Sequence, residues 1–375
     1  MTAEIGARPQ RALLVKLGAL GDCMMMLPAA ERLHHEGWQV EWMCGQAIAP
    51  LLGLFPWLRL HIIDETALMT GGRSGALRAL AGAWRQLRLG EPYDLVATIY
   101  YDARYRLLTA PVRARRRITL SHTDRALRLL PGRAHADEYD RILSGRTDQQ
   151  QPGHIAPLLA PEIACPLPRT AAARIVLVPG GARNLLRDSA LRRWPLDSFA
   201  TLARLLLDAG HEVVLAGGPG DRWAVGAFAE LQVVDCIGNF SLVETLGLFQ
   251  SADVVVTPDS GPLHLAGLTR ASILALFGPT SPHNFLPRRP GVIGLWGGEN
   301  FACRPCYDGG ELPACPSNGC LQQVTPARVA DWVCHLLTAE GRQAEARIVP
   351  ISSPKSTPCV SDSPGGAPVW PGGPA

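Results

Sequence analysis

Several short loops combine glycine with a charged side chain, and each directly follows an apolar segment. The first loop spans residues 18–22 (GALGD), behind the apolar residues 11–17. Glycines let a backbone approach a ligand closely, and the amino end of the helix that follows favours an anion. Asp22 either faces such a ligand or only caps the helix, and the spacing leaves both roles open. The loop lacks the GxGxxG and GK[ST] patterns, so it does not indicate a dinucleotide or P-loop site.

Two further loops follow apolar segments in the second half of the chain. Residues 179–183 (PGGAR) lead to Arg192 and Arg193, just before a Trp-Pro pair. Paired guanidinium groups near a glycine turn suit a diphosphate, although a solvated basic turn is the alternative. Residues 217–221 (GGPGD) end in Asp221, which either accepts hydrogen bonds from ribose hydroxyls or caps a helix.

The loop after residues 254–257 is the most specific of the set. Residues 258–264 (PDSGPLH) open a helix, and residues 278–280 (GPT) close the same rim after the next apolar segment. Backbone amides at the start of a helix bind phosphate. The histidine one turn into this helix is either part of the site or a core residue. The loop 258–264 offers a carboxylate, a hydroxyl, backbone amides and an imidazole, from Asp259, Ser260, Gly261 and His264.

The elements that must position these loops alternate along the chain. Buried strands are expected at residues 11–17, 39–44, 59–63, 93–99, 174–178, 212–216, 253–257 and 272–277, with helical segments between them. Such alternation is typical of parallel sheets covered by helices. We therefore expect an α/β protein with two Rossmann-like domains that face a central cleft, and ligands at the carboxyl ends of the strands. The expected divisions are a domain over 1–150, a Pro-rich linker over 151–173, a domain over 174–340 and a disordered tail over 341–375.

The loops occur together in an order that resembles glycosyltransferase family 9, the lipopolysaccharide heptosyltransferases and their relatives. The resemblance covers about residues 10–340. It rests on VKLGALGD with LPAA, PGGAR with LRRWP, LAGGPGD, PDSGPLHLAG and LFGPT, at residues 15–30, 179–195, 215–221, 258–267 and 276–280.

This resemblance implies a GT-B fold and an inverting, metal-independent transfer from a nucleotide sugar. The usual donor is an ADP-heptose and the usual acceptor is the growing lipopolysaccharide inner core. The family's proposed base maps to Asp22, and its phosphate-binding lysine maps to Arg192, which keeps the charge but changes the geometry. The first domain should hold the acceptor, at Gly18 and Gly21. The second should hold the donor, at Gly180, Arg192, Arg193, Gly218, Asp221, Asp259, Ser260, Gly261, His264 and Thr280.

Four cysteines lie within eighteen residues near the end of the second domain, at Cys303, Cys306, Cys315 and Cys320. Four thiols in close array are typical of a structural zinc site in a reducing compartment. Free thiols, or disulfides formed on handling, are the other interpretation. Neither interpretation implies a catalytic metal, and we expect catalysis to need no cofactor.

Composition and charge limit the class of protein and the cell compartment that are expected for the chain. The 375 residues are 47% hydrophobic and 18% charged, with a net charge of +3, which indicates a globular protein rather than a dedicated nucleic-acid binder. Apolar runs fall far short of the roughly 20 residues that span a bilayer. We expect a cytoplasmic protein, peripheral at the inner face of the membrane.

Residues 104–133 carry nine arginines against the single acid Asp124, and are either a solvated face or a docking surface for an anionic glycolipid.

Three alternatives to heptosyl transfer stay open from the sequence. A related transferase could use a different nucleotide sugar. An epimerase with the same fold could isomerise the sugar of a nucleotide sugar without any acceptor. A module that binds a sugar nucleotide without catalysis is the third, although Asp22, Arg192 and Asp259 argue against it.

Overall fold

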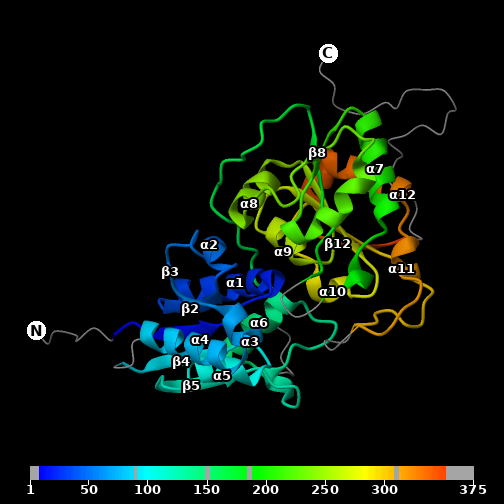
Figure 1. Ribbon diagram of the computed structural model, residues 1–375. Coiled ribbons are helices and arrows are strands. Elements are labelled where there is room, and N and C mark those ends of the chain that lie inside the picture. Colours follow the sequence, from blue (N-terminus) through cyan, green and yellow to red (C-terminus); the bar gives the residue numbers. More distant parts are fainter. Residues whose placement is uncertain (1–7, 88–90, 148–152, 184–187, 308–311, 352–375) are drawn as a thin grey trace, which may run out of the picture. The chain divides into compact units, whose positions relative to one another are not determined.

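The computed structural model describes residues 8–87, 91–147, 153–183, 188–307 and 312–351. The chain divides into two compact units, unit 1 (Met1–Pro161) and unit 2 (Glu162–Ala375), which run from blue to teal and from green to red in Figure 1. The division lies within the segment 151–173 that was expected to link two domains, and residues 153–173 form no helix or strand. Among the described residues, no helix is both long and apolar enough to cross a membrane.

Unit 1 is built on a five-stranded parallel sheet in the order β3-β2-β1-β4-β5. Its central strand is buried along its whole length because it is apolar on both faces and lies between two neighbours. The strands are β1 (Arg11–Val15), β2 (Gln39–Gly45), β3 (Leu58–Ile63), β4 (Tyr93–Thr98) and β5 (Ala114–Thr119).

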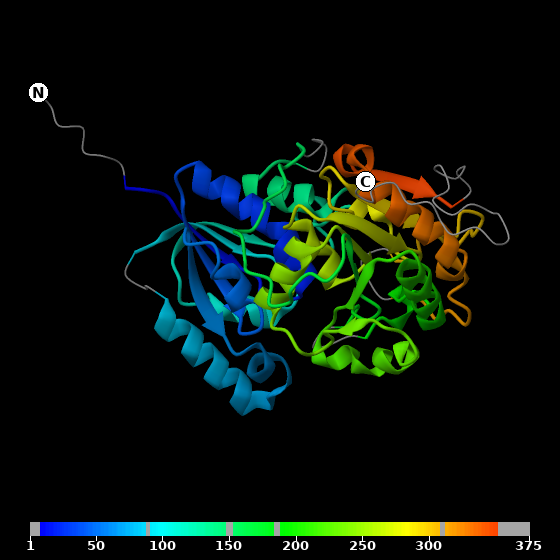
Figure 2. The same cartoon turned by 90° about the horizontal axis from the view of Figure 1, so that it is seen from above.

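Helices cover both faces of this sheet, as Figure 2 shows from above. One face carries α1 and α6, which pack against each other, and the other carries α3, α4 and α5. The helices are α1 (Leu20–His35), α2 (Ala49–Leu52), α3 (Glu65–Thr70), α4 (Gly72–Gln86), α5 (Ala103–Leu108) and α6 (His135–Ser144).

Unit 2 is also built on a parallel sheet, which has seven strands in the order β12-β11-β10-β9-β6-β7-β8. Its strands are β6 (Arg174–Leu177), β7 (Glu212–Leu215), β8 (Val234–Asp235), β9 (Val254–Pro258), β10 (Ser272–Phe277), β11 (Val292–Trp296) and β12 (Arg347–Pro350). In Figure 1, α7 and α12 cover one face and α8 and α9 the other. The helices are α7 (Leu196–Asp208), α8 (Leu242–Ser251), α9 (Gly261–Gly267), α10 (Pro282–Phe285), α11 (Gly319–Gln322), α12 (Pro326–Leu337) and α13 (Ala339–Gln343).

These two sheets confirm the α/β class and the pair of Rossmann-like domains expected of a GT-B fold. The expected disorder from residue 341 is wrong for residues 341–351, because β12 pairs in parallel with β11 and extends the sheet of unit 2. The sequence after this short strand is rich in proline, glycine and serine, which led to the prediction of disorder for the whole segment. Residues 352–375 lie outside the described residues. The sequence analysis also missed β5, α6 and β11.

An equivalent buried arginine–glutamate ion pair lies at the amino end of the first strand of each unit, β1 and β6. Arg11, the first residue of β1, lies 2.8 Å from Glu41 of β2, and both side chains are about 95% buried. Burial alone would raise the pKa of Glu41, but hydrogen bonds from His61, Arg11 and Tyr93 hold it at about 2. On the other side of β1, the backbone amide of Arg11 donates to Asp94 over 3.0 Å.

Unit 2 places equivalent groups at the same positions. Arg174, the first residue of β6, lies 2.6 Å from Glu212 of β7, with both side chains buried. Its backbone amide donates to Asp253, just before β9, over 2.8 Å. Burial opposes ionisation of Glu212, yet hydrogen bonds from Arg174 and Thr170 hold its pKa below the usual value.

We expect Arg174→Leu to lower the free energy of unfolding by about 3–5 kcal/mol, because it leaves Glu212 buried without its cation. Denaturant titration followed by circular dichroism measures this change. The matched control is Arg342→Leu, whose side chain is 50% exposed and lies 3.8 Å from Asp253. The control should cost less than about 1 kcal/mol. Equal losses in the two variants would show that the buried pair does not constrain the fold.

Candidate functional site

Asp22 lies at the carboxyl end of the central strand of unit 1, in the first turn of α1. The cap position of that helix belongs to Ala19, and no side chain caps it, so the capping interpretation of Asp22 is not supported. The Asp22 side chain is 34% exposed. Its carboxylate is therefore open to solvent on one side and held by the protein on the other.

Two buried groups hold Asp22 that the sequence analysis did not find. Lys16 directly follows β1, and its Nζ lies 2.8 Å from an Asp22 oxygen while its own side chain is 2% exposed. Burial opposes the charge on this amine, but the neighbouring Asp22 carboxylate raises the pKa of Lys16 overall. Tyr139 of α6 also hydrogen-bonds Asp22, and burial raises its pKa well above the usual value, so it stays a neutral donor. Together they fix an ionised carboxylate in one orientation.

Gly18, at the start of the loop that contains Asp22, lies close to a second carboxylate. A Cβ added to Gly18 would meet the Glu65 carboxylate oxygens of α3 at 3.1 Å, so a larger residue would crowd this loop. Burial raises the pKa of Glu65, to which Tyr105 donates a hydrogen bond over 3.2 Å. Gly21 lies in the first turn of α1. Contact of Gly18 and Gly21 with an acceptor stays a prediction.

In unit 2 the polar groups at the ends of β9 and β10 are buried but poorly satisfied. Asp259, 1% exposed, lies 3.0 Å from a terminal nitrogen of Arg192, which is close enough for an ion pair but not aligned as a hydrogen bond. Within the described residues, neither Asp259 oxygen nor the Thr280 hydroxyl nor the Arg192 Nε has a hydrogen-bond partner. A buried unsatisfied polar group costs about 1–3 kcal/mol, so such a cluster is typical of a binding site.

The loop after β6 packs directly onto this cluster. Gly181 has φ +82°, and an added Cβ would meet the Ser260 hydroxyl at 2.8 Å. The next residue, Ala182, also has a positive φ of 56°. The structure thus brings together the two loops that the sequence analysis assigned to the donor phosphates.

Arg192 and Arg193, which the sequence could not tell apart, have different surroundings. Arg192 faces Asp259, whereas Arg193 donates to the Gly181 carbonyl over 3.0 Å and lies over the Trp223 ring. Arg193 therefore supports the glycine loop, and Arg192 is the cation next to the unsatisfied cluster.

Asp221 links two of the predicted loops. One of its oxygens accepts from the amide of Gly181 and the other from that of Gly218, each over 2.9 Å. A Cβ added to Gly180 would meet the Asp221 carboxyl carbon at 2.3 Å. These contacts give Asp221 a structural role, and its contact with a donor stays a prediction. His264 is buried one turn into α9, and its contact with a donor also stays a prediction.

The cysteine segment attaches to the same rim of unit 2. The amides of Cys306 and Tyr307 donate to the Pro279 carbonyl over 2.8 and 3.2 Å, next to Thr280. Cys303 is exposed, Cys306 and Cys315 are half-buried, and Cys320 is buried. In the part of the chain that the structure describes, no three metal-binding side chains are arranged to hold an ion. Structural zinc at these thiols stays a prediction.

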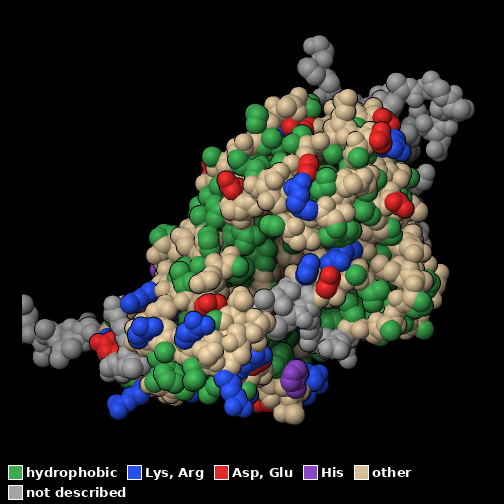
Figure 3. All heavy atoms as spheres, in the orientation of Figure 1, with side chains coloured by type: hydrophobic (Ala, Val, Ile, Leu, Met, Phe, Trp, Pro, Cys, Tyr) green, Lys and Arg blue, Asp and Glu red, His purple; other side chains and the backbone are tan. Residues whose placement is uncertain are grey.

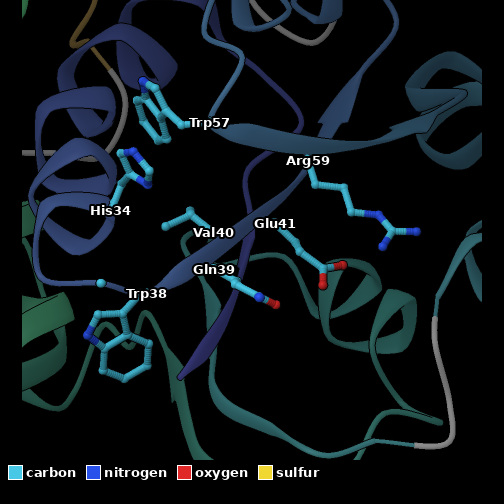
Figure 4. Close-up of a pocket in the computed structure, with 8 residues that line it drawn as sticks. His34, Trp38, Gln39, Val40, Glu41, Trp57 and Arg59 are labelled. Atoms are coloured by element: carbon cyan, nitrogen blue, oxygen red, sulfur yellow. The ribbon is translucent and has the colours of Figure 1, made fainter. Parts of the chain in front are cut away.

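A hollow of about 400 Å³ lies at the other end of the sheet of unit 1, where β2 and β3 begin. Figure 4 shows its stacked Trp57 and His34 rings, whose centroids are 5.2 Å apart. The Glu41 carboxylate at its edge is already bound by Arg11, His61 and Tyr93. No residue predicted from the sequence as a site residue lines this hollow, so it is separate from the Asp22 loop.

Comparison with known proteins gives a consistent family. Residues 170–311 match the sequence family "Glycosyltransferase family 9 (heptosyltransferase)". Lipooligosaccharide heptosyltransferase 2 of Haemophilus influenzae is 35% identical over 98 residues, which are 24% of this chain and 28% of that protein. Lipopolysaccharide heptosyltransferase 1 of Pseudomonas aeruginosa is 26% identical over 319 residues, covering 79% of this chain and 86% of the relative. The chain thus spans under a third of the first relative's length and most of the second's.

Solved structures share the fold. The ADP-heptose lps heptosyltransferase II of E. coli superposes with a TM-score of 0.65 at 20% identity, covering 88% of this chain and 98% of that one. The family 9 glycosyl transferase of Veillonella parvula gives 0.63 at 20% identity, covering 76% and 85%. The chain is therefore similar to glycosyltransferase family 9 over residues 170–311, and it shares its fold with solved structures of heptosyltransferases.

Proposed function

We propose that the chain is an inverting glycosyltransferase that moves heptose from ADP-heptose onto a lipopolysaccharide-type core acceptor. The observation that carries the proposal is the Asp22 carboxylate, part-exposed after the first strand and held by the buried Lys16. The similarity of residues 170–311 to glycosyltransferase family 9 supports glycosyl transfer. The names of the relatives support the sugar and the acceptor, since those proteins are heptosyltransferases of lipopolysaccharide and lipooligosaccharide.

Asp22 acts as the general base in this proposal. The acceptor hydroxyl attacks the anomeric carbon in one displacement, which inverts the configuration, and its proton passes to the carboxylate. Lys16 and Tyr139 act through Asp22, since they hold the carboxylate in place and leave its exposed side for the acceptor. No covalent intermediate on the protein is required.

Unit 2 holds the donor in the same proposal. The bond to the leaving ADP breaks as negative charge grows on its diphosphate, and Arg192 is the cation that stabilises this charge. A carboxylate repels phosphate but accepts hydrogen bonds from hydroxyls. We therefore assign the unsatisfied oxygens of Asp259 to sugar or ribose hydroxyls, and the Thr280 hydroxyl to a phosphate oxygen.

The donor is identified by a thermal-shift panel of ADP-, UDP-, GDP- and CMP-sugars. A ligand that binds the native state adds RT ln(1 + [L]/Kd) to its stability, so the correct donor gives the largest shift. ADP-heptose should lead the panel. A larger shift with another sugar nucleotide would replace the donor while keeping the reaction class. Isomerised sugar formed without an acceptor would indicate an epimerase instead.

We expect Asp22→Asn to lower kcat by roughly 10²–10⁴-fold with little change in donor affinity, because the amide cannot take the proton. Steady-state kinetics on a deacylated core acceptor measures this loss. Asp197→Asn is the matched control, since Asp197 lies in the first turn of α7 and its side chain is exposed. If Asp22→Asn turns over like the control, Asp22 is not the base.

We expect Arg192→Ala to weaken ADP binding by about 1.5–3 kcal/mol, or roughly 10–150-fold in Kd, through loss of a charge-assisted contact. Isothermal titration calorimetry with free ADP measures the affinity. Arg204→Ala, an exposed arginine of α7, is the control and should bind ADP like the wild type. Unchanged affinity in Arg192→Ala together with a loss in Arg193→Ala would move the phosphate contact to Arg193.

We expect activity to persist in EDTA, because Arg192 and the loop amides supply the positive potential that a metal would otherwise supply. Initial rates before and after chelation test this expectation. Loss of activity that magnesium or manganese restores would contradict it. Loss that only zinc restores would indicate that the cysteine segment needs the ion for its structure.

A further inference from the structure

Large apolar side chains exposed to solvent gather on one part of unit 1. Leu77 of α4 is 67% exposed, Trp84 of the same helix 39%, and Leu107 of α5 48%. The indole nitrogen of Trp84 donates to the Leu107 carbonyl over 3.0 Å, which joins the two helices at this point. The three side chains therefore belong to one surface.

The α4 helix exposes large apolar side chains on its solvent face. Its fully buried positions are the small residues Gly75, Ala79 and Ala83, and Leu80 is partly buried against the core of unit 1. Its solvent face instead carries Leu77 and Trp84, seven positions and about two turns apart. A surface helix normally buries its large apolar side chains, so this face is suited to a further apolar contact.

Positive charge surrounds the exposed apolar residues. The sequence has no acidic residue between Glu65 and Glu91, and α4 contains three arginines, Arg73, Arg78 and Arg85. Arg106 of α5 adds a fourth next to Leu107, and all four side chains are exposed. Among the described residues, none of these arginines forms an ion pair with a carboxylate. Figure 3 shows basic and apolar side chains side by side over the region of α4 and α5.

The arginine-rich segment 104–133, expected from the sequence to dock on a membrane, is largely engaged within unit 1. Arg115 lies 3.2 Å from Asp94, and Arg116 donates to the Leu143 carbonyl over 3.4 Å. Arg117 donates to the Thr109 carbonyl over 3.1 Å, and Arg104 pairs with Asp102 over 2.6 Å. Each of these arginines has a partner within unit 1, although Arg115 stays 70% exposed. Among the described residues no arginine of α4 pairs with a carboxylate, so α4 is the better candidate for an external partner.

We infer that α4 and the adjoining end of α5 form a docking surface for an anionic phospholipid bilayer. Basic amphipathic helices with tryptophan and leucine on the apolar side lie in the membrane interface, where the arginines meet lipid phosphates. A second copy of the chain fits less well, because a symmetric contact would bring the same unpaired arginines together. The inference deepens the proposed function, since a lipid-borne acceptor lies on such a surface.

Co-sedimentation of the full chain with vesicles tests the surface without any donor or acceptor. Wild type should bind vesicles of phosphatidylglycerol with phosphatidylcholine, release them at about 0.5 M salt, and not bind phosphatidylcholine alone. Arg78→Glu and Leu77→Asp should each weaken binding by roughly tenfold or more. The matched control Arg204→Glu makes the same charge change on an exposed turn of α7 and should bind like the wild type.

Fluorescence provides a second measurement. Brominated lipids should quench the emission of wild type, and Trp84→Phe should remove part of that quenching while the melting temperature stays unchanged. Activity on a deacylated, soluble acceptor should be the same in all the α4 variants. A failure of the surface is therefore distinguishable from a failure of the proposed reaction.

Three results would overturn the inference. Binding to neutral vesicles as strong as to anionic ones would remove the role of the arginines. Self-association in light scattering that Leu77→Asp abolishes, without vesicle binding, would assign the surface to a second copy. Loss of binding in the triple variant Arg115→Glu, Arg116→Glu, Arg117→Glu, with the α4 variants unchanged, would assign it to the arginine-rich segment.

Discussion

A buried arginine–glutamate pair at the amino end of the first strand, β1 in unit 1 and β6 in unit 2, constrains each unit. Arg11 with Glu41, and Arg174 with Glu212, fix two neighbouring strands near their amino ends. An ion pair this deeply buried adds little net stability over an apolar contact, but it is very costly to break. Its effect is on register, because only one alignment of the strands brings both charges together. With the amino ends fixed in this way, the carboxyl ends keep constant positions and are the part of each sheet that can carry a site.

The contrast between the two ends of unit 1 shows how the same residue types serve different purposes. At the amino end, the Glu41 carboxylate is surrounded by Arg11, His61 and Tyr93, and its pKa falls to about 2, so it stays charged and engaged. At the carboxyl end, Asp22 has Lys16 and Tyr139 on one side and solvent on the other. A carboxylate held only from behind can still receive a proton, whereas one that is enclosed cannot.

Much of this arrangement follows from the sequence, and the remainder has identifiable causes. Short apolar segments and the glycines behind them located most of the strands and the loops that contain Asp22, Arg192 and Asp259. The contact of Tyr139 with Asp22 was not predictable, because Tyr139 belongs to α6, which is far from the Asp22 loop along the sequence. Lys16 was detectable in principle as one of only two lysines in a chain rich in arginine. The choice between Arg192 and Arg193 depends on side-chain direction, which adjacent positions in a sequence do not reveal.

The carboxylate of Asp221 has a consequence for how unit 2 meets a ligand. It accepts hydrogen bonds from the amides of Gly181 and Gly218, so the loops after β6 and β7 are joined through one side chain. Glycine loops lose more backbone freedom on ordering than other loops do. Here that freedom is already lost when the chain folds, before any ligand arrives. In the proposed function, a nucleotide that binds at these loops therefore loses little affinity to loop ordering, and its on-rate should be limited by diffusion and orientation rather than by a slow rearrangement of these glycines.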